Sequence, residues 1–250
     1  MGATHLLFHN QGRGRPIGGG VVTPIPKTIA GLTVWLDGSD ISTLYQDSAK
    51  TTPVTADGDV VGAMADLSGN GNDVVQATTA NKPLYKASIQ NSLSVVRFDG
   101  VNDYLAATAF TLNQPEHVFL VGNVIAWTSN DYIWDGNTLD LMGLYSQVPD
   151  RLALYAGAGG PFIVPTPGTY LLISAVFDGA SSDIRLNGGA AVTGNVGANN
   201  AGGLTVGANG GHAAGFGNIE VGEMLVYNVE LTGADLTTIK NYLNEKWNIY

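Results

Sequence analysis

The sequence predicts an all-β protein built as a two-sheet antiparallel sandwich. Charged residues make up only 13% of the chain, against about 25% in typical soluble domains, so the residues that cover long surface helices are scarce. Short β-rich segments alternate with clusters of Gly, Asn, Asp and Pro, and 34 residues are glycine. Because no helical pattern separates these segments, an antiparallel sandwich is favoured over βαβ units.

Residues 1–28 are expected to form a flexible basic arm that precedes a single domain, residues 29–250. The arm contains Arg13, Arg15 and Lys27 and no acid, whereas the rest of the chain holds all 21 acidic residues and 8 of the 11 basic ones. Glycine loosens this segment and proline stiffens it. A short disordered tail without a binding role is the alternative interpretation.

From Thr33 onward the pattern predicts a succession of strands, while residues 46–66 and 73–93 carry no strong pattern and are expected to be loops. The Asn187-Gly188 pair predicts a type I′ hairpin turn. The clearest expected strands are Thr33–Leu36, Ser94–Phe98, His117–Ile125, Leu139–Tyr145, Leu152–Ala156, Tyr170–Phe177, Ile184–Asn187, Leu204–Val206 and Ile219–Tyr227.

Two of these strands carry information about burial. Segment 170–177 is apolar at nearly every position, which is typical of a central strand covered on both faces. Segment 219–227 alternates, so one set of side chains should line the core. That set is Ile219, Val221, Leu225 and Tyr227.

One short helix is expected at the C-terminal end. Thr232 can cap its N-terminus, and apolar residues then recur at helical spacing. The helix should therefore lie on the sandwich, with Trp35 and Trp247 in the core. The apolar positions are Leu236, Ile239, Leu243 and Trp247.

Five motifs, in this order, resemble the concanavalin A-like lectin/glucanase superfamily, in its laminin-G-like jelly-roll branch of bacterial surface and phage virion proteins. The resemblance covers residues 29–250 and implies a jelly roll of two curved antiparallel sheets. Members include glycan binders, adhesion modules, virion domains and some hydrolases, so the fold alone does not indicate which of these activities a member has. The motifs are Gly31–Asp37, Asp66–Asp73, Val96–Leu105, Phe177–Gly179 with Ile184–Gly188, and Ile219–Tyr227 followed by Leu243–Trp247.

Composition excludes several classes of function. The net charge of −10 repels a phosphate backbone, so nucleic acid is not an expected partner. The chain has no cysteine, so disulfides and thiolate zinc sites are excluded. No apolar stretch approaches the length of a membrane span, so membrane insertion is not expected. Near the N-terminus the apolar stretch Leu6–Phe8 is much shorter than that of a signal peptide, so a secretion signal is not expected.

The glutamates argue against catalysis. Hydrolases of this superfamily that resemble laminarinases place acid and nucleophile on one face of a strand, and retaining chemistry needs the carboxyls about 5 Å apart. Glu220 and Glu223 are the only close pair, and three residues apart on a regular strand they point to opposite faces. The chain is therefore expected not to be an enzyme.

Aromatic, amide and carboxylate side chains gather in residues 127–137, where they could form a glycan-binding surface because sugar faces stack on aromatic rings. Ordinary sandwich packing is the alternative. The candidate ligand-binding residues are Trp127, Asn130, Tyr132, Trp134, Asp135 and Asn137.

No cofactor is expected, except that calcium is possible because it prefers oxygen ligands. One cluster is Asp131 with Asp135, Asn137 and Asp140, of which the three acids are the candidate ligands; the other is Asp66 with Asn70, Asn72 and Asp73. The alternative is that these side chains shape turns.

Together these features predict a non-catalytic surface-binding or decoration module, a structural component of a bacteriophage capsid or tail that could bind glycans. Arg13 and Arg15 are the candidate contacts to a capsid or tail protein, and the expected location is the virion. Two alternatives stay open: a polysaccharide-acting glycoside hydrolase or lyase, and an extracellular adhesion domain at a bacterial surface.

Overall fold

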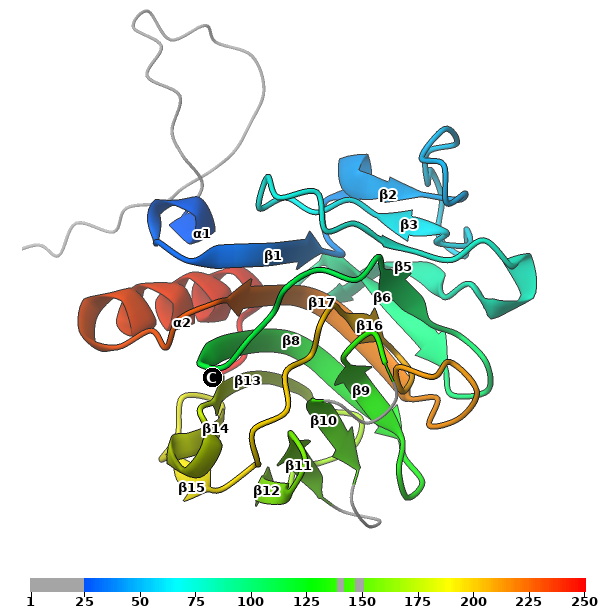
Figure 1. The fold of residues 1–250 in the computed structure, drawn as a ribbon. Coiled ribbons are helices and arrows are strands. Elements are labelled where there is room, and N and C mark those ends of the chain that lie inside the picture. Colours follow the sequence, from blue (N-terminus) through cyan, green and yellow to red (C-terminus); the bar gives the residue numbers. More distant parts are fainter. Residues whose placement is uncertain (1–24, 139–141, 147–150) are drawn as a thin grey trace, which may run out of the picture.

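The computed structural model describes residues 25–138, 142–146 and 151–250, which form two antiparallel sheets and two α-helices (Figure 1). The predicted all-β two-sheet sandwich with a C-terminal helix is confirmed. In the part of the chain described, no helix is long and apolar enough to cross a membrane.

The first sheet has eight strands in the order β15-β14-β13-β8-β17-β6-β5, with β1 pairing with β17 off this path. Its long central strands agree with the segments predicted from hydrophobic patterns. The strands are β1 (Leu32–Asp37), β5 (Leu84–Gln90), β6 (Leu93–Asp99), β8 (Glu116–Ala126), β13 (Tyr170–Phe177), β14 (Ser182–Leu186), β15 (Val192–Gly194) and β17 (Asn218–Tyr227).

The second sheet has nine short strands in the order β12-β11-β10-β9-β16-β7-β4-β3-β2. The expectation of loops at 46–66 and 73–93 is wrong in part, because β3, β4 and the whole of β5 lie there. The strands are β2 (Leu44–Tyr45), β3 (Ala63–Met64), β4 (Val74–Val75), β7 (Leu105–Ala107), β9 (Tyr132–Asp135), β10 (Gly143–Ser146), β11 (Leu152–Tyr155), β12 (Gly159–Ile163) and β16 (Thr205–Val206).

The connections between strands include short helical turns and the predicted turn at Asn187-Gly188. Asn187 and Gly188 have φ of 49° and 69°, as the predicted type I′ turn requires. Three single 3₁₀ turns occur at Ile41–Thr43, Thr79–Asn81 and Gly179–Ser181.

The main core fills the space between the two sheets. Phe98 and Phe177 from the first sheet and Trp134 from the second are essentially without exposed surface, and the rings of Trp134 and Phe177 meet edge to face at 5.4 Å. Strand β13 is covered on both sides, since Ile173 lies in this core while Leu172 lies in a second cluster on the outer face. The prediction for 170–177 is therefore confirmed.

Strand β17 changes its inward-facing side chains part-way along. Its register with β8 shifts between Val221 and Glu223, which marks a β-bulge. Ile219 and Val221 line the main core as predicted, but beyond the bulge Met224 and Val226 take over, and Leu225 and Tyr227 turn to the outer face. The prediction that all four odd-numbered residues share a face is therefore wrong.

Helix α2 (Gly233–Trp247) covers this outer face, with the short helix α1 (Ile25–Thr28) beside it (Figure 1). Ile239, Leu243 and Trp247 are buried against the sheet, as predicted, and Leu236 is partly buried. Thr232 holds the N-cap position, but its side chain makes no capping hydrogen bond. Gly222 is the point of closest approach, because a Cβ there would lie 2.7 Å from the Trp247 ring.

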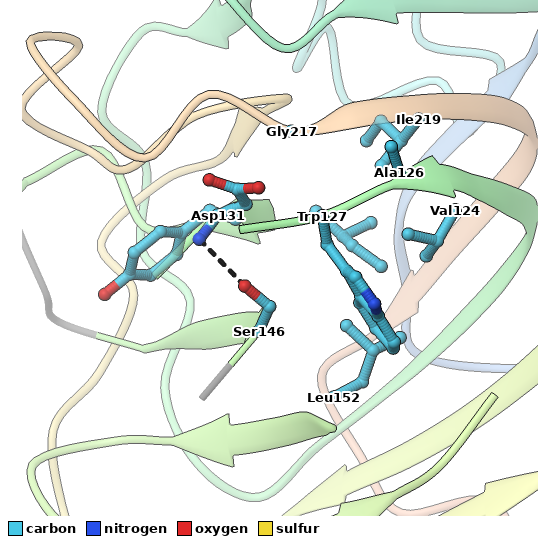
Figure 2. Close-up of a pocket in the computed structure, with 10 residues that line it drawn as sticks. Val124, Ala126, Trp127, Asp131, Ser146, Leu152, Gly217 and Ile219 are labelled. Carbon is cyan, nitrogen blue, oxygen red and sulfur yellow. Dashed lines mark hydrogen bonds between the residues drawn. The ribbon is translucent and has the colours of Figure 1, made fainter. Parts of the chain in front are cut away.

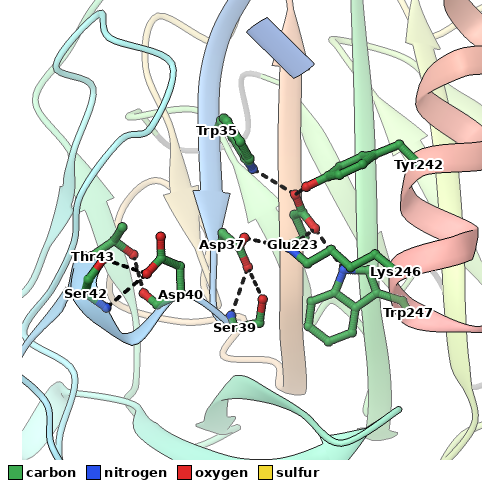
Figure 3. A network of polar contacts seen from close by, with 10 residues as sticks. All are labelled: Trp35, Asp37, Ser39, Asp40, Ser42, Thr43, Glu223, Tyr242, Lys246 and Trp247. Atoms are coloured by element: carbon green, nitrogen blue, oxygen red, sulfur yellow. Dashed lines mark hydrogen bonds and ion pairs between the residues drawn. The ribbon is translucent and has the colours of Figure 1, made fainter. Parts of the chain in front are cut away.

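Glu223 ties the helix to the sheet (Figure 3). Its carboxylate accepts hydrogen bonds at 2.8 Å from Nε1 of both Trp35 and Trp247, and at 2.7 Å from the hydroxyl of Tyr242. Nζ of Lys246 bridges Glu223 and Asp37 at 2.8 and 2.6 Å. Burial raises the pKa of Glu223 and the charge of Lys246 opposes that shift, so the lysine offsets part of the cost of burying this carboxylate.

Residues 25–28 are part of the packed body rather than of an extended segment. Pro26 is buried, and its carbonyl accepts a hydrogen bond from the hydroxyl of Tyr227 at 3.1 Å. Ile29 joins the same apolar cluster as α2. The division between arm and domain at residue 28 stays a prediction, with residues 1–24 outside the described residues.

We expect Trp247→Ala to lower the free energy of unfolding by about 3–5 kcal/mol, since it leaves a cavity against Gly222 and unpairs part of Glu223. Urea denaturation at pH 7 measures this. Glu245→Ala, an exposed position on the same helix, is the matched control and should change the value by no more than about 0.5 kcal/mol. An unchanged urea midpoint for Trp247→Ala would mean that the helix is not docked as described.

Candidate functional site

Three loops of the first and second sheets meet at one edge of the sandwich because of strand register. Asn218, the first residue of β17, pairs with Asp99 at the end of β6 on one side and with Ala126 at the end of β8 on the other. The chain segments that follow β6 and β8 and the segment that precedes β17 therefore converge there. Binding residues are commonly found on such loops above a rigid sheet.

These loops enclose an open depression of about 160 Å³. Trp127 and Phe216 supply aromatic surface, and Asp99, Asp131 and Asn218 supply polar groups. The remaining lining residues are Gly100, Ala126 and Thr128.

Beside Trp127 lies a second, much smaller space of about 10 Å³, which is room for a single water at most. Figure 2 shows the Trp127 ring directed toward Leu152, with Asp131 across from it. Trp127 is partly buried against the main core. The Trp127 side chain is thus supported by the packed core and also lines the depression.

The loop that carries Asp131 is firmly anchored. The Asp131 carboxylate accepts hydrogen bonds from the backbone and the hydroxyl of Thr128 at 2.5 and 2.9 Å. Its backbone exchanges hydrogen bonds with Ser146 on β10, at 3.0 Å to the hydroxyl and 2.8 Å from the backbone N–H. The carboxylate is therefore held in place before any ligand arrives.

Several polar groups of the depression have hydrogen-bonding capacity left. Asp99 accepts from the backbone N–H groups of Val101 and Asn102 through Oδ1 alone. Among the residues described, its Oδ2, the side-chain amide of Asn218 and the indole N–H of Trp127 carry no hydrogen bond. A carboxylate, an amide and an indole N–H can together accept from and donate to a polar ligand.

The structure divides the predicted ligand-binding residues. Trp127 lines the depression, and Tyr132 lines the smaller space beside it. Asn130 is exposed and Asn137 half-buried, but neither lines these spaces, and Trp134 and Asp135 are interior residues with 1% and 0% exposure. Asp99, Phe216 and Asn218 were not among the sequence candidates. Arg13 and Arg15 lie outside the described residues.

Asp131 and Asp135 do not converge on one point. Asp135 is buried and accepts from the backbone N–H groups of Gly136 and Gly210, each at 2.8 Å, while Asp131 lines the depression. Asp140 lies outside the described residues. Across the described ranges no group of three or more His, Cys, Asp or Glu side chains is placed to hold a metal ion.

The second cluster considered for calcium shapes a loop that holds β1. The Asp66 carboxylate accepts from the backbone N–H groups of Trp35 and Asn72 at 2.9 and 3.0 Å. The amides of Asn70 and Asn72 donate to the carbonyl of Thr33 at 3.1 and 2.9 Å. The Asp66 carboxylate is therefore occupied by backbone N–H groups, and the amides of Asn70 and Asn72 are occupied by a backbone carbonyl. This is the turn-forming role of Asp and Asn.

Glu220 and Glu223 lie on the same face of the sheet, contrary to prediction, because the bulge at Gly222 adds a residue between them. Glu220 is 3% exposed and Glu223 0%. Glu220 pairs with Arg97 and accepts from the hydroxyl of Tyr170 at 2.7 Å and from the amide of Asn123 at 3.1 Å. Both carboxylates are thus engaged in internal networks, away from the depression.

Two neighbouring residues of β8 have strongly shifted pKa values. Burial raises the pKa of Glu116 to about 8, and both its oxygens are buried without a hydrogen-bond partner in the part of the chain described. Burial, with the charge of Arg185, lowers the pKa of His117 to about 3. Its Nδ1 accepts from the backbone N–H of Leu231 at 3.2 Å and its Nε2 faces the hydroxyl of Ser174 at 2.7 Å, so the ring is neutral.

No family model and no curated protein sequence matches the chain. Solved structures do resemble it. Trypanosoma rangeli sialidase matches with a TM-score of 0.56 and 13% identity, over 87% of this chain and 33% of the sialidase. The binding domain of Paraclostridial Mosquitocidal Protein 1 matches with a TM-score of 0.58 and 12% identity, over 88% and 53% of the two chains. An α-L-arabinofuranosidase matches with a TM-score of 0.54 and 13% identity, over 73% and 50%.

At these identities the likeness shows the fold, a jelly-roll-like β-sandwich, and this chain spans between a third and about half of each neighbour. The expectation that the chain is not an enzyme is contradicted by these neighbours, since the sialidase and the arabinofuranosidase are enzymes that act on glycans.

Glu116→Gln should stabilise the protein relative to wild type at high pH. A carboxyl whose folded pKa of about 8 lies above its ordinary value of 4.5 contributes its full stability below pH 4.5 and loses it as the pH rises through 8. We expect the difference between variant and wild type to grow by about 2–4 kcal/mol from pH 4.5 to pH 8.5. Urea denaturation across this range measures it, and a pH-independent difference would contradict the buried, protonated carboxyl.

Proposed function

We propose that this chain is a carbohydrate-binding domain whose ligand occupies the depression beside Trp127. The observation that carries the proposal is an open space of about 160 Å³ in which aromatic surface stands next to unbonded polar groups. Apolar faces of sugar rings stack on aromatic side chains, while their hydroxyls need hydrogen-bond partners in the plane of the ring. The depression offers both within one small area.

Each lining residue has a distinct part in this proposal. The indole of Trp127 provides the stacking surface, and its N–H is available to donate to a ring oxygen or hydroxyl. Asp99 and Asp131 accept from hydroxyls, and the amide of Asn218 can accept and donate. Because Asp131 is already held by Thr128 and Ser146, little ordering of that loop accompanies binding.

The size of the depression indicates a small ligand. Pockets for drug-sized molecules usually measure about 300–1,000 Å³, so a space of about 160 Å³ fits one sugar ring or the end of a glycan chain. An open site of this size buries little ligand surface. Single-site binding is therefore expected to be weak, in the millimolar to micromolar range, about −4 to −8 kcal/mol.

Two further observations support a carbohydrate role. Two structural neighbours are named as sialidase and arabinofuranosidase, and a third is a binding domain. The five sequence motifs that resemble the concanavalin A-like superfamily point the same way, and membership of that superfamily is part of this proposal.

The wider setting that we propose is a bacteriophage particle, in which the domain is attached through its N-terminal segment. The support is the charge distribution: residues 1–27 are basic without an acid, and the remaining chain holds all 21 acids. A basic segment can pair with carboxylates of a capsid or tail protein. The glycan would then belong to the surface that the particle meets.

Trp127→Ala should weaken glycan binding by about thirtyfold, or about 2 kcal/mol, through loss of the stacking surface. The measurement is a glycan-array screen followed by titration calorimetry with the best-binding glycan. Phe162→Ala, which removes another aromatic ring that is 36% exposed and does not line the depression, is the control and should leave binding unchanged. Equal affinity of Trp127→Ala and wild type would overturn the assignment of the site.

Replacing both Arg13 and Arg15 with Ser should lower occupancy of the protein on particles that lack the native copy. The loss should be larger at low salt than at high salt, where screening already weakens charge pairing. Quantitative gel analysis of purified particles measures occupancy, and the circular dichroism spectrum should not change. Wild-type occupancy by a variant lacking residues 1–24 would place the attachment surface on the sandwich.

A further inference from the structure

The charged residues that line the depression are all acidic. Two of its lining residues, Asp99 and Asp131, carry carboxylates, and no Lys, Arg or His occurs among the residues described as lining it. A third acid, Asp103, lies behind Asp99 and accepts its backbone N–H at 3.0 Å. Burial, and then the charge of Asp99, raises the pKa of Asp103 to about 6, so it too is largely ionised at neutral pH.

The nearest basic side chains in the sequence are engaged elsewhere. Arg97, two residues before Asp99, is bonded to Glu220 on the outer face of the sheet. The guanidinium of Arg151, next to Leu152, lies 4.3 Å from the centre of the Phe162 ring. Neither residue lines the depression, so no cation in the described ranges of the chain balances the negative potential there.

This charge restricts the ligand. An anionic sugar would bring a carboxylate into a small space already holding two carboxylates, without an arginine or lysine to pair with it. A neutral sugar meets no such penalty, since carboxylates accept well from hydroxyls. An ammonium group on a sugar would gain a charge-assisted hydrogen bond.

We propose that the depression selects glycans without negative charge, and that sugars bearing a free amine bind best. Sialic acids and uronic acids are thereby disfavoured, even though one structural neighbour is a sialidase determined with bound sialic acid. This inference rests on the proposed carbohydrate-binding function and deepens it by naming the class of ligand.

The size of the preference follows from the exposure of the site. Charge pairs at a solvated surface change an equilibrium by about 1.4- to fivefold each. Two carboxylates should therefore separate amino, neutral and acidic forms of one sugar by about two- to twentyfold at each step. Because the depression is open to water, 0.5 M salt should reduce these ratios toward one.

The test is titration of the full chain with matched glucosamine, glucose and glucuronic acid oligosaccharides, and with the galactose equivalents, at 20 mM and 500 mM NaCl. We expect the affinity order amino, neutral, acidic in whichever configuration binds. The double variant Asp99→Asn/Asp131→Asn should bring the three affinities within about twofold of each other, since the amides keep their hydrogen bonds but carry no charge. Asp57→Asn, an exposed acid away from the depression, is the matched control and should keep the order.

The outcomes separate this inference from the function on which it rests. Binding of acidic sugars as tightly as neutral ones would overturn the charge selectivity and leave carbohydrate binding intact. Absence of binding by every sugar on the array would overturn both. If the double variant is less stable, as judged by its melting temperature, the salt dependence of wild type decides: an affinity order unchanged by salt would contradict the electrostatic origin.

Discussion

The arrangement of this protein depends on one buried carboxylate. Glu223 has no exposed surface, and its hydrogen bonds reach β1 through Trp35 and α2 through Tyr242, Lys246 and Trp247. An ion in such a place is costly unless each oxygen is satisfied. That requirement specifies where the helix lies, because only one position of α2 brings three of its donors to the same two oxygen atoms.

The bulge in β17 is what makes this contact compatible with a two-sided sheet. If β17 alternated regularly through Gly222, the face that begins with Ile219 and Val221 would continue to Glu223, and the carboxylate would enter the main core. With the bulge, Met224 continues the inner face and Glu223 turns outward. The bulge at Gly222 thus allows one strand to present apolar side chains to the core and Glu223 to the helix. The first residue of the same strand, Asn218, lines the depression.

The sequence predicts the parts of this fold whose signals are local. Segment 170–177 is apolar on both faces and was recognised, as was the helical spacing that ends at Trp247. Three two-residue strands of the second sheet, β2, β3 and β4, escape prediction because so few positions establish no period. The bulge is predicted only as an option, since a glycine within an alternating strand marks a place where a bulge can form but does not establish that the strand adopts one.

The candidate site shows the same division. Trp127 and its polar neighbours form a local cluster that can be recognised from composition, but its partners Asp99 and Asn218 are distant in sequence and meet only through the pairing of β17 with β6 and β8. Asp99 also shapes a turn through Val101 and Asn102, and a turn-forming aspartate looks the same in sequence whether or not its second oxygen is open to a ligand. Residue propensities therefore predict the turn at Asp99, but the register of β17 with β6 and β8 is needed to place Asn218 and Trp127 beside it.

Helix α1 and the depression lie at opposite ends of β17, which affects how the depression would be oriented on a larger assembly. Pro26 contacts Tyr227 at one end of β17, whereas Asn218 and the depression lie at the other end of this ten-residue strand. At about 3.4 Å per residue the two ends are roughly 30 Å apart. Any scaffold joined ahead of residue 25 would hold the depression on the far side, facing outward, so an array of copies would present many weak sites in parallel. Avidity on a repetitive glycan surface can then exceed the affinity of one depression by orders of magnitude.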